Sequence, residues 1–423
     1  MAKISTPWYY GWNIVGTGMT FQAVLFGLTF FSFIFWAPIW AEEFDANLSY
    51  VQWANVGMMV AQGLISPFAG HFMDRLSIKW LITCGAISAS LGFVAVSQAT
   101  EVWHIIVVYC TLIPVGVLLS GPLAAQTLCA KWFNARRGFA IGLSTTGTSI
   151  GGFLLPILVG LLFSSLGWRT THLVLAALIV VIVIPVVWTF VANNPEDLGI
   201  EPEPEAELHE SAGPPHVYPA WTTMRILQER NFWVVILAFV PLMTAQGAIQ
   251  ANLAAFAIDI GTARELTPQL ISVMSLTMIG GKLFFGRQAD YWDHRYLFIF
   301  AVVLIAIVIF LMLSEPTFSM LMVTVGILGV GTGAFLPMLG AIISSRFGPA
   351  GFGKVMGLLG PFTTASALGT VFAADVYDRT GSFQPAWEVF LFATIPAVVA
   401  IMFLKPKPGD EKAQPQAAPA AGE

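Results

Sequence analysis

Apolar stretches of about 20 residues recur along the whole chain, and each is long enough to cross a bilayer as one helix. The composition agrees, because 57% of the 423 residues are hydrophobic and 10% are charged. A soluble domain carries about 25% charged residues. The short segments of alternating hydrophobicity that build a membrane β-barrel are absent. The sequence therefore predicts an all-α membrane protein with many spans.

The apolar stretches predict twelve membrane-spanning helices. They are expected at residues 11–39, 49–70, 80–98, 102–130, 138–165, 169–192, 231–258, 268–288, 297–314, 317–345, 353–375 and 385–404. The longest polar connection is acidic and proline-rich, which is typical of a solvated linker, and it separates six spans from six spans. The predicted domains are an N-terminal bundle at 1–192, a cytoplasmic linker at 193–230, a C-terminal bundle at 231–404 and a disordered cytoplasmic tail at 405–423.

The distribution of Lys and Arg predicts the orientation. If the N-terminus lies inside, most basic residues of the connections face the cytoplasm, and Arg169, Arg264 and Arg379 are the exceptions. We therefore expect both termini in the cytoplasm of a multi-pass protein of a bacterial inner membrane. The apolar run from Gly11 is too long for a cleavable signal, so the first span is expected to remain. The net charge of −5, without a basic tract, argues against a nucleic-acid partner.

The two halves of the chain resemble each other at an offset of about 215 residues. Two short glycine motifs occur in both halves. They are Gly70-x-x-x-Asp74 with Gly286-x-x-x-Asp290, and Gly138-x-x-x-Gly142 with Gly353-x-x-x-Gly357. An internal repeat of six spans is typical of transporters whose two bundles rock around a central site.

Lys282 is the single charge in the apolar stretch 270–286. A cation at membrane depth is costly, so its default interpretation is functional, with an anion as its partner. It lies about 14 residues into its predicted span, or about 21 Å from the outer end. The alternative is that the long side chain extends to the nearby inner interface. The first interpretation predicts a carrier of small organic anions.

Other polar or aromatic residues inside the predicted spans are candidate substrate contacts. They are Gln126, Thr145, Gln246, Gln250, Asn252, Phe335 and Thr364. For each polar residue, a hydrogen bond between helices is the competing interpretation.

Charged residues at the predicted helix ends suggest a latch. The conformational residues are Gly70, Asp74, Arg75, Arg136, Gly286, Asp290 and Arg295. We expect carboxylate–guanidinium pairs among them to hold the halves together in one state and to release in the other. Asp259 and Asp375, near the outer face, are candidate proton carriers or simply solvated helix ends. The histidines are scattered, so no metal site and no cofactor are expected.

The loop motif formed by Gly70, Asp74, Arg75 and Lys79 resembles that of the major facilitator superfamily, although Ser77 stands where glycine is usual. Within the superfamily, the chain is similar to the monocarboxylate transporter and oxalate/formate antiporter group. The matching segments are Tyr9-Tyr-Gly-Trp12, Arg136-Arg137-Gly138, Gly167-Trp168-Arg169, Asn194-Pro-Glu-Asp-Leu-Gly199 and Tyr377-Asp-Arg-Thr-Gly-Ser382. The order and spacing of these segments carry the resemblance.

The resemblance implies a monomer with two pseudo-symmetric six-helix bundles and secondary transport of a small monocarboxylate. That family places an Arg in span 8 on the substrate carboxylate, and Lys282 takes this position. Met278 stands where animal monocarboxylate transporters have an acid linked to proton coupling, and residues 11–39 lack the family's charged Lys. We expect proton-coupled symport, with anion exchange of the oxalate/formate type as the alternative.

Two other functional classes are possible in principle. A membrane-embedded enzyme needs paired acids, a Ser/His pair or metal ligands, and the spans hold no such cluster, so the chain is not expected to be an enzyme. A transporter-like receptor would need a long signalling tail, and the chain after Lys407 is a short Ala/Pro-rich run.

Overall fold

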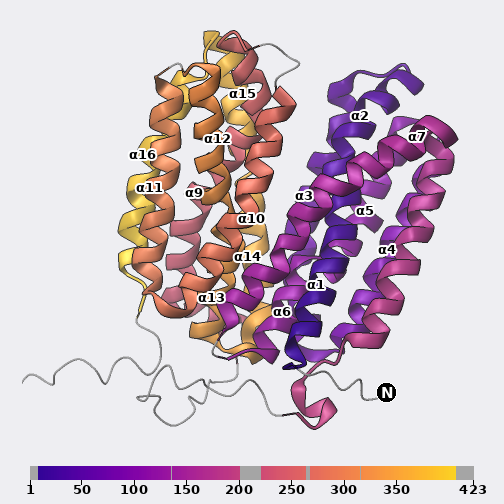
Figure 1. The fold of residues 1–423 in the computed structure, drawn as a ribbon, viewed down its shortest axis with the longest axis vertical. Helices are drawn as coiled ribbons and strands as arrows, with labels where there is room; N and C mark the ends of the chain where they lie inside the picture. Colours follow the sequence, from indigo (N-terminus) through magenta and orange to yellow (C-terminus); the bar gives the residue numbers. More distant parts are fainter. Residues whose placement is uncertain (1–7, 135, 201–220, 263–266, 315, 406–423) are drawn as a thin grey trace, which may run out of the picture.

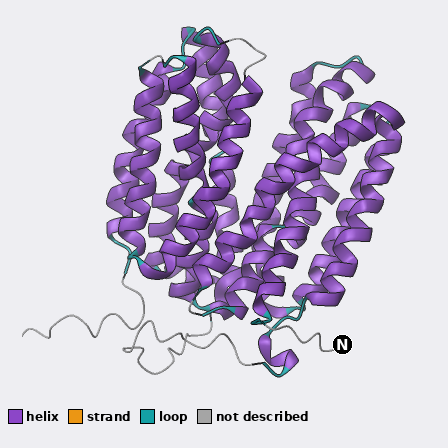
Figure 2. Cartoon of the chain, in the orientation of Figure 1, coloured by secondary structure: helices purple, strands orange, loops and turns teal. Residues whose placement is uncertain are grey.

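The described residues fold into long helices, most of which are joined by short connections (Figure 1). A computed structural model describes residues 8–134, 136–200, 221–262, 267–314 and 316–405. Within these ranges the chain consists of helices and loops, without a strand (Figure 2). Arg264, residues 201–220 of the predicted linker and residues 406–423 of the predicted tail lie outside the described ranges.

The first half contains seven α-helices and a π-helical turn, η1, within its described residues. They are α1 (Gly11–Phe26), η1 (Gly27–Phe31), α2 (Ser32–Glu43), α3 (Leu48–Arg75), α4 (Ile78–Ser97), α5 (Val102–Ser120), α6 (Pro122–Trp132) and α7 (Arg137–Phe190).

The rest of the described chain adds nine α-helices and two short 3-10 turns. They are η2 (Pro195–Leu198), α8 (Thr223–Gln228), α9 (Arg230–Asp259), α10 (Thr267–Tyr291), α11 (His294–Leu313), α12 (Phe318–Gly333), α13 (Phe335–Phe347), η4 (Pro349–Gly351), α14 (Phe352–Ala365), α15 (Leu368–Thr380) and α16 (Gln384–Met402).

All twelve predicted spans fall on helices, with ends that differ by a few residues. Ten helical stretches of the described chain are long and apolar enough to cross a membrane. One of them, α7, is 54 residues long and breaks at Gly167, whose φ of 71° is not helical, so it accounts for two predicted spans. The remaining predicted span is α3, which is more polar because it carries Gln52, Asn55 and Gln62.

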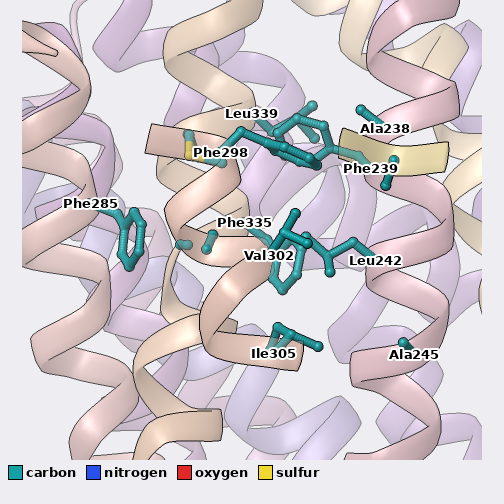
Figure 3. Close-up of a cluster of buried hydrophobic side chains, with 14 of the residues drawn as sticks. Ala238, Phe239, Leu242, Ala245, Phe285, Phe298, Val302, Ile305, Phe335 and Leu339 are labelled. Carbon is teal, nitrogen blue, oxygen red and sulfur yellow. The ribbon is translucent and has the colours of Figure 1, made fainter. Parts of the chain in front are cut away.

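Each half has its own apolar core. One cluster of buried residues extends from Tyr10 to Ala192, and the other joins Ala130 to residues from Ile226 to Leu404. Figure 1 shows the corresponding helices as two bundles side by side. Figure 3 shows part of the second core, in which Phe298 and Leu339 lie beside helix α9. Each half therefore packs mainly on itself, which suits motion of one bundle against the other.

Two helix crossings join the halves: α3 packs on α14, and α7 packs on α10. Figure 1 shows the two bundles close together near α6 and α13 and farther apart at the opposite end. We name the former the closed end, and Asp74 and Asp290 lie there. Lys282, Thr145, Asp74 and Asp290 belong to the helices of these two crossings.

Candidate functional site

Small residues bring α10 into close contact with α7. A Cβ added to Gly142 would lie 2.6 Å from the carbonyl oxygen of Lys282, and one added to Gly286 would lie 2.8 Å from the carbonyl oxygen of Gly138. Neither position tolerates a larger residue without a shift of backbone. The glycines that the repeat predicts therefore set the separation of α7 and α10, and they place Lys282 at the crossing.

Lys282 is buried, with 3% of its surface exposed, and its ammonium group contacts the other half of the protein. Nζ donates to the carbonyl oxygen of Thr145 at 2.9 Å, to Oγ1 of Thr148 at 2.7 Å and to Oγ of Ser149 at 2.7 Å. All three acceptors belong to α7. The side chain thus reaches across the crossing, and extension to the inner interface, the alternative considered from sequence, does not occur in this structure.

The acceptors of Lys282 come from the polar stretch Ser144–Ser149 of α7. Thr148 and Ser149 lie three and four residues after Thr145, so the three residues share one face of the helix. The sequence prediction included Thr145 in the site but omitted Thr148 and Ser149. Their spacing from Thr145 was the available signal, but it does not reveal which helix they face.

At the closed end, two carboxylates bind the N-termini of helices from the other half. Asp74, at the end of α3, accepts from the amides of Gly353 at 2.9 Å and Lys354 at 2.7 Å. Asp290, at the end of α10, accepts from the amides of Gly138 at 2.6 Å and Phe139 at 2.9 Å. A helix N-terminus offers unpaired N–H groups and the positive end of the helix dipole. The contacts of Asp74 and Asp290 are equivalent, because both the aspartates and the helix N-termini that they bind are related by the internal repeat.

The predicted carboxylate–guanidinium pairing is wrong for Asp74 and Arg295. Asp74 makes no ion pair within the described residues, and Arg295 pairs with Asp293 of its own half at 2.8 Å. Arg75 is exposed, and the exposed Arg136 lies over the ring of Trp12. The physical reason is that glycines at the crossings bring the helix N-termini within reach of the carboxylates. Gly70, for example, faces the backbone of Gly353.

The other predicted substrate contacts are not hydrogen-bonded to Lys282. Gln246 donates to Gln250 at 2.8 Å, Asn252 donates to the carbonyl oxygen of Ala248 at 2.9 Å, Thr364 donates to that of Met59 at 3.4 Å, and Phe335 lies in the second core (Figure 3). Gln126 is fully buried, and neither atom of its amide has a hydrogen-bond partner among the described residues. Of the predicted substrate contacts, the structure joins Lys282 and Thr145.

The two candidate proton carriers lie at helix ends. Asp259 ends α9 and accepts from the hydroxyl of Tyr377 at 3.0 Å. Asp375 pairs with Arg379, one turn later in α15, at 2.9 Å. Neither carboxylate is hydrogen-bonded to Lys282. Within the described ranges, no group of three or more His, Cys, Asp and Glu residues is arranged to hold a metal ion.

Comparisons with known proteins agree with this architecture. The family model described as Major Facilitator Superfamily matches residues 19–281 and 249–422. Monocarboxylate transporter 12 of Rattus norvegicus is 23% identical over 387 residues, covering 86% of this chain and 79% of the relative. The crystal structure of the human organic anion transporter MFSD10 (TETRAN) superposes with a TM-score of 0.68 at 13% identity, covering 94% of this chain and 100% of that chain.

A second solved structure has the same fold. The E. coli fucose:proton symporter FucP superposes with a TM-score of 0.62 at 16% identity, covering 94% of this chain and 97% of that chain. These likenesses confirm the predicted fold of two six-helix bundles.

Proposed function

The chain belongs to the Major Facilitator Superfamily, and from this premise we propose that it carries a small organic anion, a monocarboxylate, across the membrane by alternating access. Proteins of this superfamily are secondary transporters and not enzymes, so the chain is a membrane transporter. Its distant relatives include monocarboxylate transporters. The proposed part is the substrate class, together with the way in which transport is coupled.

The observation that carries the proposal is the buried ammonium of Lys282 between the two halves. A buried cation attracts an anion far more strongly than the same charge in water, because the surrounding dielectric constant is low. The single positive charge of Lys282 is neutralised by one carboxylate, which favours a monocarboxylate. Its present partners are neutral oxygen atoms, and a carboxylate would form stronger, charge-assisted hydrogen bonds. Lys282 is therefore the proposed anchor of the substrate.

We further propose that the closed end faces the cytoplasm of a bacterial inner membrane, with both termini on that side, and that the protein acts as a monomer. The excess of Lys and Arg among the connections of this end supports that orientation. The structure then corresponds to a state closed toward the cytoplasm. Asp74 and Asp290 are the proposed latch of this state, because each binds the other half. Release of both contacts would accompany opening toward the cytoplasm.

Proton-coupled symport is the proposed mode of transport, and exchange of one anion for another is the second candidate. Exchange is favoured by one observation: the two candidate carboxylates, Asp259 and Asp375, lie at helix ends and bind other partners. In exchange, no proton carrier is needed. A proton gradient across proteoliposomes distinguishes the modes, because it drives accumulation of the anion in symport and has no such effect on strict exchange.

The test of the proposed function is binding and uptake by the purified protein. Lactate, pyruvate, benzoate and oxalate are screened by thermal shift, and the best binder is then radiolabelled for uptake into proteoliposomes. We expect Lys282→Ala to lose both the thermal shift and at least about 100-fold of the uptake, since removing one partner of a buried charge pair costs about 3 kcal/mol or more.

Lys405→Ala is the matched control, because Lys405 is an exposed lysine that pairs with Glu229. It should bind and transport as the wild type does. Uptake by Lys282→Ala at the wild-type rate would contradict the proposed anchor. A wild-type protein that binds none of the four carboxylates would contradict the proposed substrate class.

A further inference from the structure

The ammonium group of Lys282 has no spare hydrogen-bond donor. A protonated lysine has three N–H donors and no acceptor. In the structure all three donate hydrogen bonds, to the carbonyl oxygen of Thr145 and to the hydroxyl oxygens of Thr148 and Ser149. A substrate carboxylate can therefore bind Lys282 well only if it displaces at least one of these oxygens. Lys282 must change partners during the transport cycle.

Two of the three partners are hydroxyl groups, which can donate as well as accept. A neutral lysine amine has two N–H donors and one lone pair, so it needs one donor among its partners. Among the described residues, the Ser149 hydroxyl makes no hydrogen bond except the one from Lys282, so its proton can turn toward that lone pair. This cradle of Thr145, Thr148 and Ser149 therefore satisfies the amine in both protonation states. A carboxylate in its place would accept only and would hold the lysine charged.

Among the residues that the structure describes, no other titratable group lies near the middle of α10 or of the helical segments packed on it. The described titratable and charged residues of α10 and of the elements packed on it lie near helix ends or the break at Gly167. They are Arg287, Asp290 and Tyr291 on α10; Arg137, Arg169 and His172 on α7; Arg230 and Asp259 on α9; His294, Arg295 and Tyr296 on α11; and Arg346 on α13, with none on α12. The nearest acid along α10, Asp290, is eight residues or about 12 Å away.

We propose that Lys282 carries the symported proton as well as the substrate carboxylate. From outside, the neutral amine takes up one proton, and the resulting ammonium binds one carboxylate, which displaces the cradle. After the closed end opens, the carboxylate and the proton both pass to cytoplasmic water, and the neutral amine returns to the cradle. One anion and one proton move per cycle, and no net charge is transferred. The inference rests on the proposed function, because it assigns a second role to the same residue.

The replacement Lys282→Arg tests the proposal, because arginine keeps the positive charge but does not lose its proton in proteins. The best binder among lactate, pyruvate, benzoate and oxalate is the probe. We expect Lys282→Arg to bind it and to exchange internal for external probe, while accumulation driven by a pH gradient falls at least about ten-fold. Accumulation by Lys282→Arg with the wild-type pH dependence would overturn the proposal and leave the carboxylate-binding role intact.

A proton count decides the question if Lys282→Arg does not bind. The probe is added to purified wild-type protein in weak buffer with a pH indicator, between pH 7 and pH 9. We expect uptake of up to about one proton per anion bound, increasing with pH, because binding requires the charged amine. Binding without proton uptake up to pH 9 would show that the empty protein keeps Lys282 charged, and would overturn the proposal.

Ser149→Ala separates the cradle from the anchor. It removes the hydroxyl that serves the neutral amine but leaves Lys282 in place, so the ratio of pH-driven accumulation to exchange should fall at least about five-fold. Thr146→Val is the matched control, because the Thr146 hydroxyl donates to the carbonyl oxygen of Leu143 and is not among the hydrogen-bond partners of Lys282 in the described residues. Equal effects of the two variants on this ratio would contradict the role of the cradle.

Discussion

Two helix crossings, α3 with α14 and α7 with α10, are related by the internal repeat. They differ in the residue at one equivalent position, which is Ser66 in the first and Lys282 in the second. Asp74 corresponds to Asp290 and Gly70 to Gly286 at an offset of 216, and the same offset relates Ser66 to Lys282. Ser66 is buried and donates to the carbonyl oxygen of Gly357 at 2.8 Å. At the equivalent place, Lys282 instead extends a charge to three oxygens of α7.

The difference between Ser66 and Lys282 suggests different roles for the two crossings: the first holds the halves together, and the second also holds the proposed substrate anchor. At the first crossing, the hydroxyl of Ser66 makes one neutral hydrogen bond between α3 and α14. This bond carries no charge that would attract an anion. The second crossing keeps equivalent glycine contacts and an equivalent aspartate, but it holds the cation of Lys282, which we propose changes partners during transport. We therefore expect substitutions of the equivalent aspartates and glycines to have similar effects at both crossings. Of the non-equivalent residues Ser66 and Lys282, only Lys282 should be essential for transport.

The largest shared effect is expected from the latch carboxylates. Asp74→Ala and Asp290→Ala each remove two hydrogen bonds to a charged group, so each should favour opening by about 3 kcal/mol, or about 100-fold. Opening is measured at Ser344 of α13, which is 1% exposed in this structure, so that a cysteine placed there is protected from a thiol reagent until the closed end opens. In a background in which Cys84, Cys110 and Cys129 are replaced by serine, Ser344→Cys should react with a thiol reagent about 100-fold faster in either variant.

Asp293→Ala is the control for the latch, because Asp293 pairs with Arg295 within one half. It should leave the labelling rate unchanged. If Asp74→Ala accelerated labelling and Asp290→Ala did not, the two crossings would not be equivalent latches.

A somewhat smaller shared effect is expected from the glycines. A methyl group at Gly70 would collide with the backbone of Gly353, and one at Gly286 would lie 2.8 Å from the carbonyl oxygen of Gly138. Gly70→Ala and Gly286→Ala should each destabilise the closed end by about 1–3 kcal/mol, measured by the same labelling rate. Gly280→Ala in α10 is the matched control, since its added methyl group meets no atom within 4 Å. An equal effect of Gly280→Ala would mean that helix propensity, and not the crossing, is responsible.

The smallest effect is expected at Ser66, and it bears most directly on the comparison. Ser66→Ala removes one neutral hydrogen bond, worth about 0.5–1.5 kcal/mol, so uptake should stay within about ten-fold of the wild type. Lys282→Ala, at the equivalent position, should abolish uptake. Similar losses in the two variants, measured side by side in proteoliposomes, would remove the functional distinction between the crossings.

Most of the fold could be predicted from local patterns. Span lengths follow from runs of apolar residues, and the matching glycine motifs predicted which helix segments repeat. Lys282 stood out because a charge in an apolar run is conspicuous without any knowledge of its neighbours. The helical break within α7 was also anticipated, since separate spans were predicted on the two sides of Gly167.

The partners of these residues could not be predicted in the same way. Asp74 binds backbone amides, which every residue except proline carries, so no side-chain pattern identifies them. The amide of Gln126 has no hydrogen-bond partner within the described residues, and whether a buried amide finds one depends on the side chains that other helices bring to it. Thr148 and Ser149 belong to a face of α7 whose neighbour, α10, lies more than 100 residues away in the chain.

Composition and spacing along single helices were enough to predict the twelve-span class, the repeat and the orientation, and to make Lys282 the first candidate for a substrate contact. The tertiary structure alone decided that Lys282 crosses to the other half and that its partners are hydroxyl and carbonyl oxygens. That outcome depends on how closely glycines allow two distant helices to approach, and such a distance is a property of the packed bundles and not of either segment.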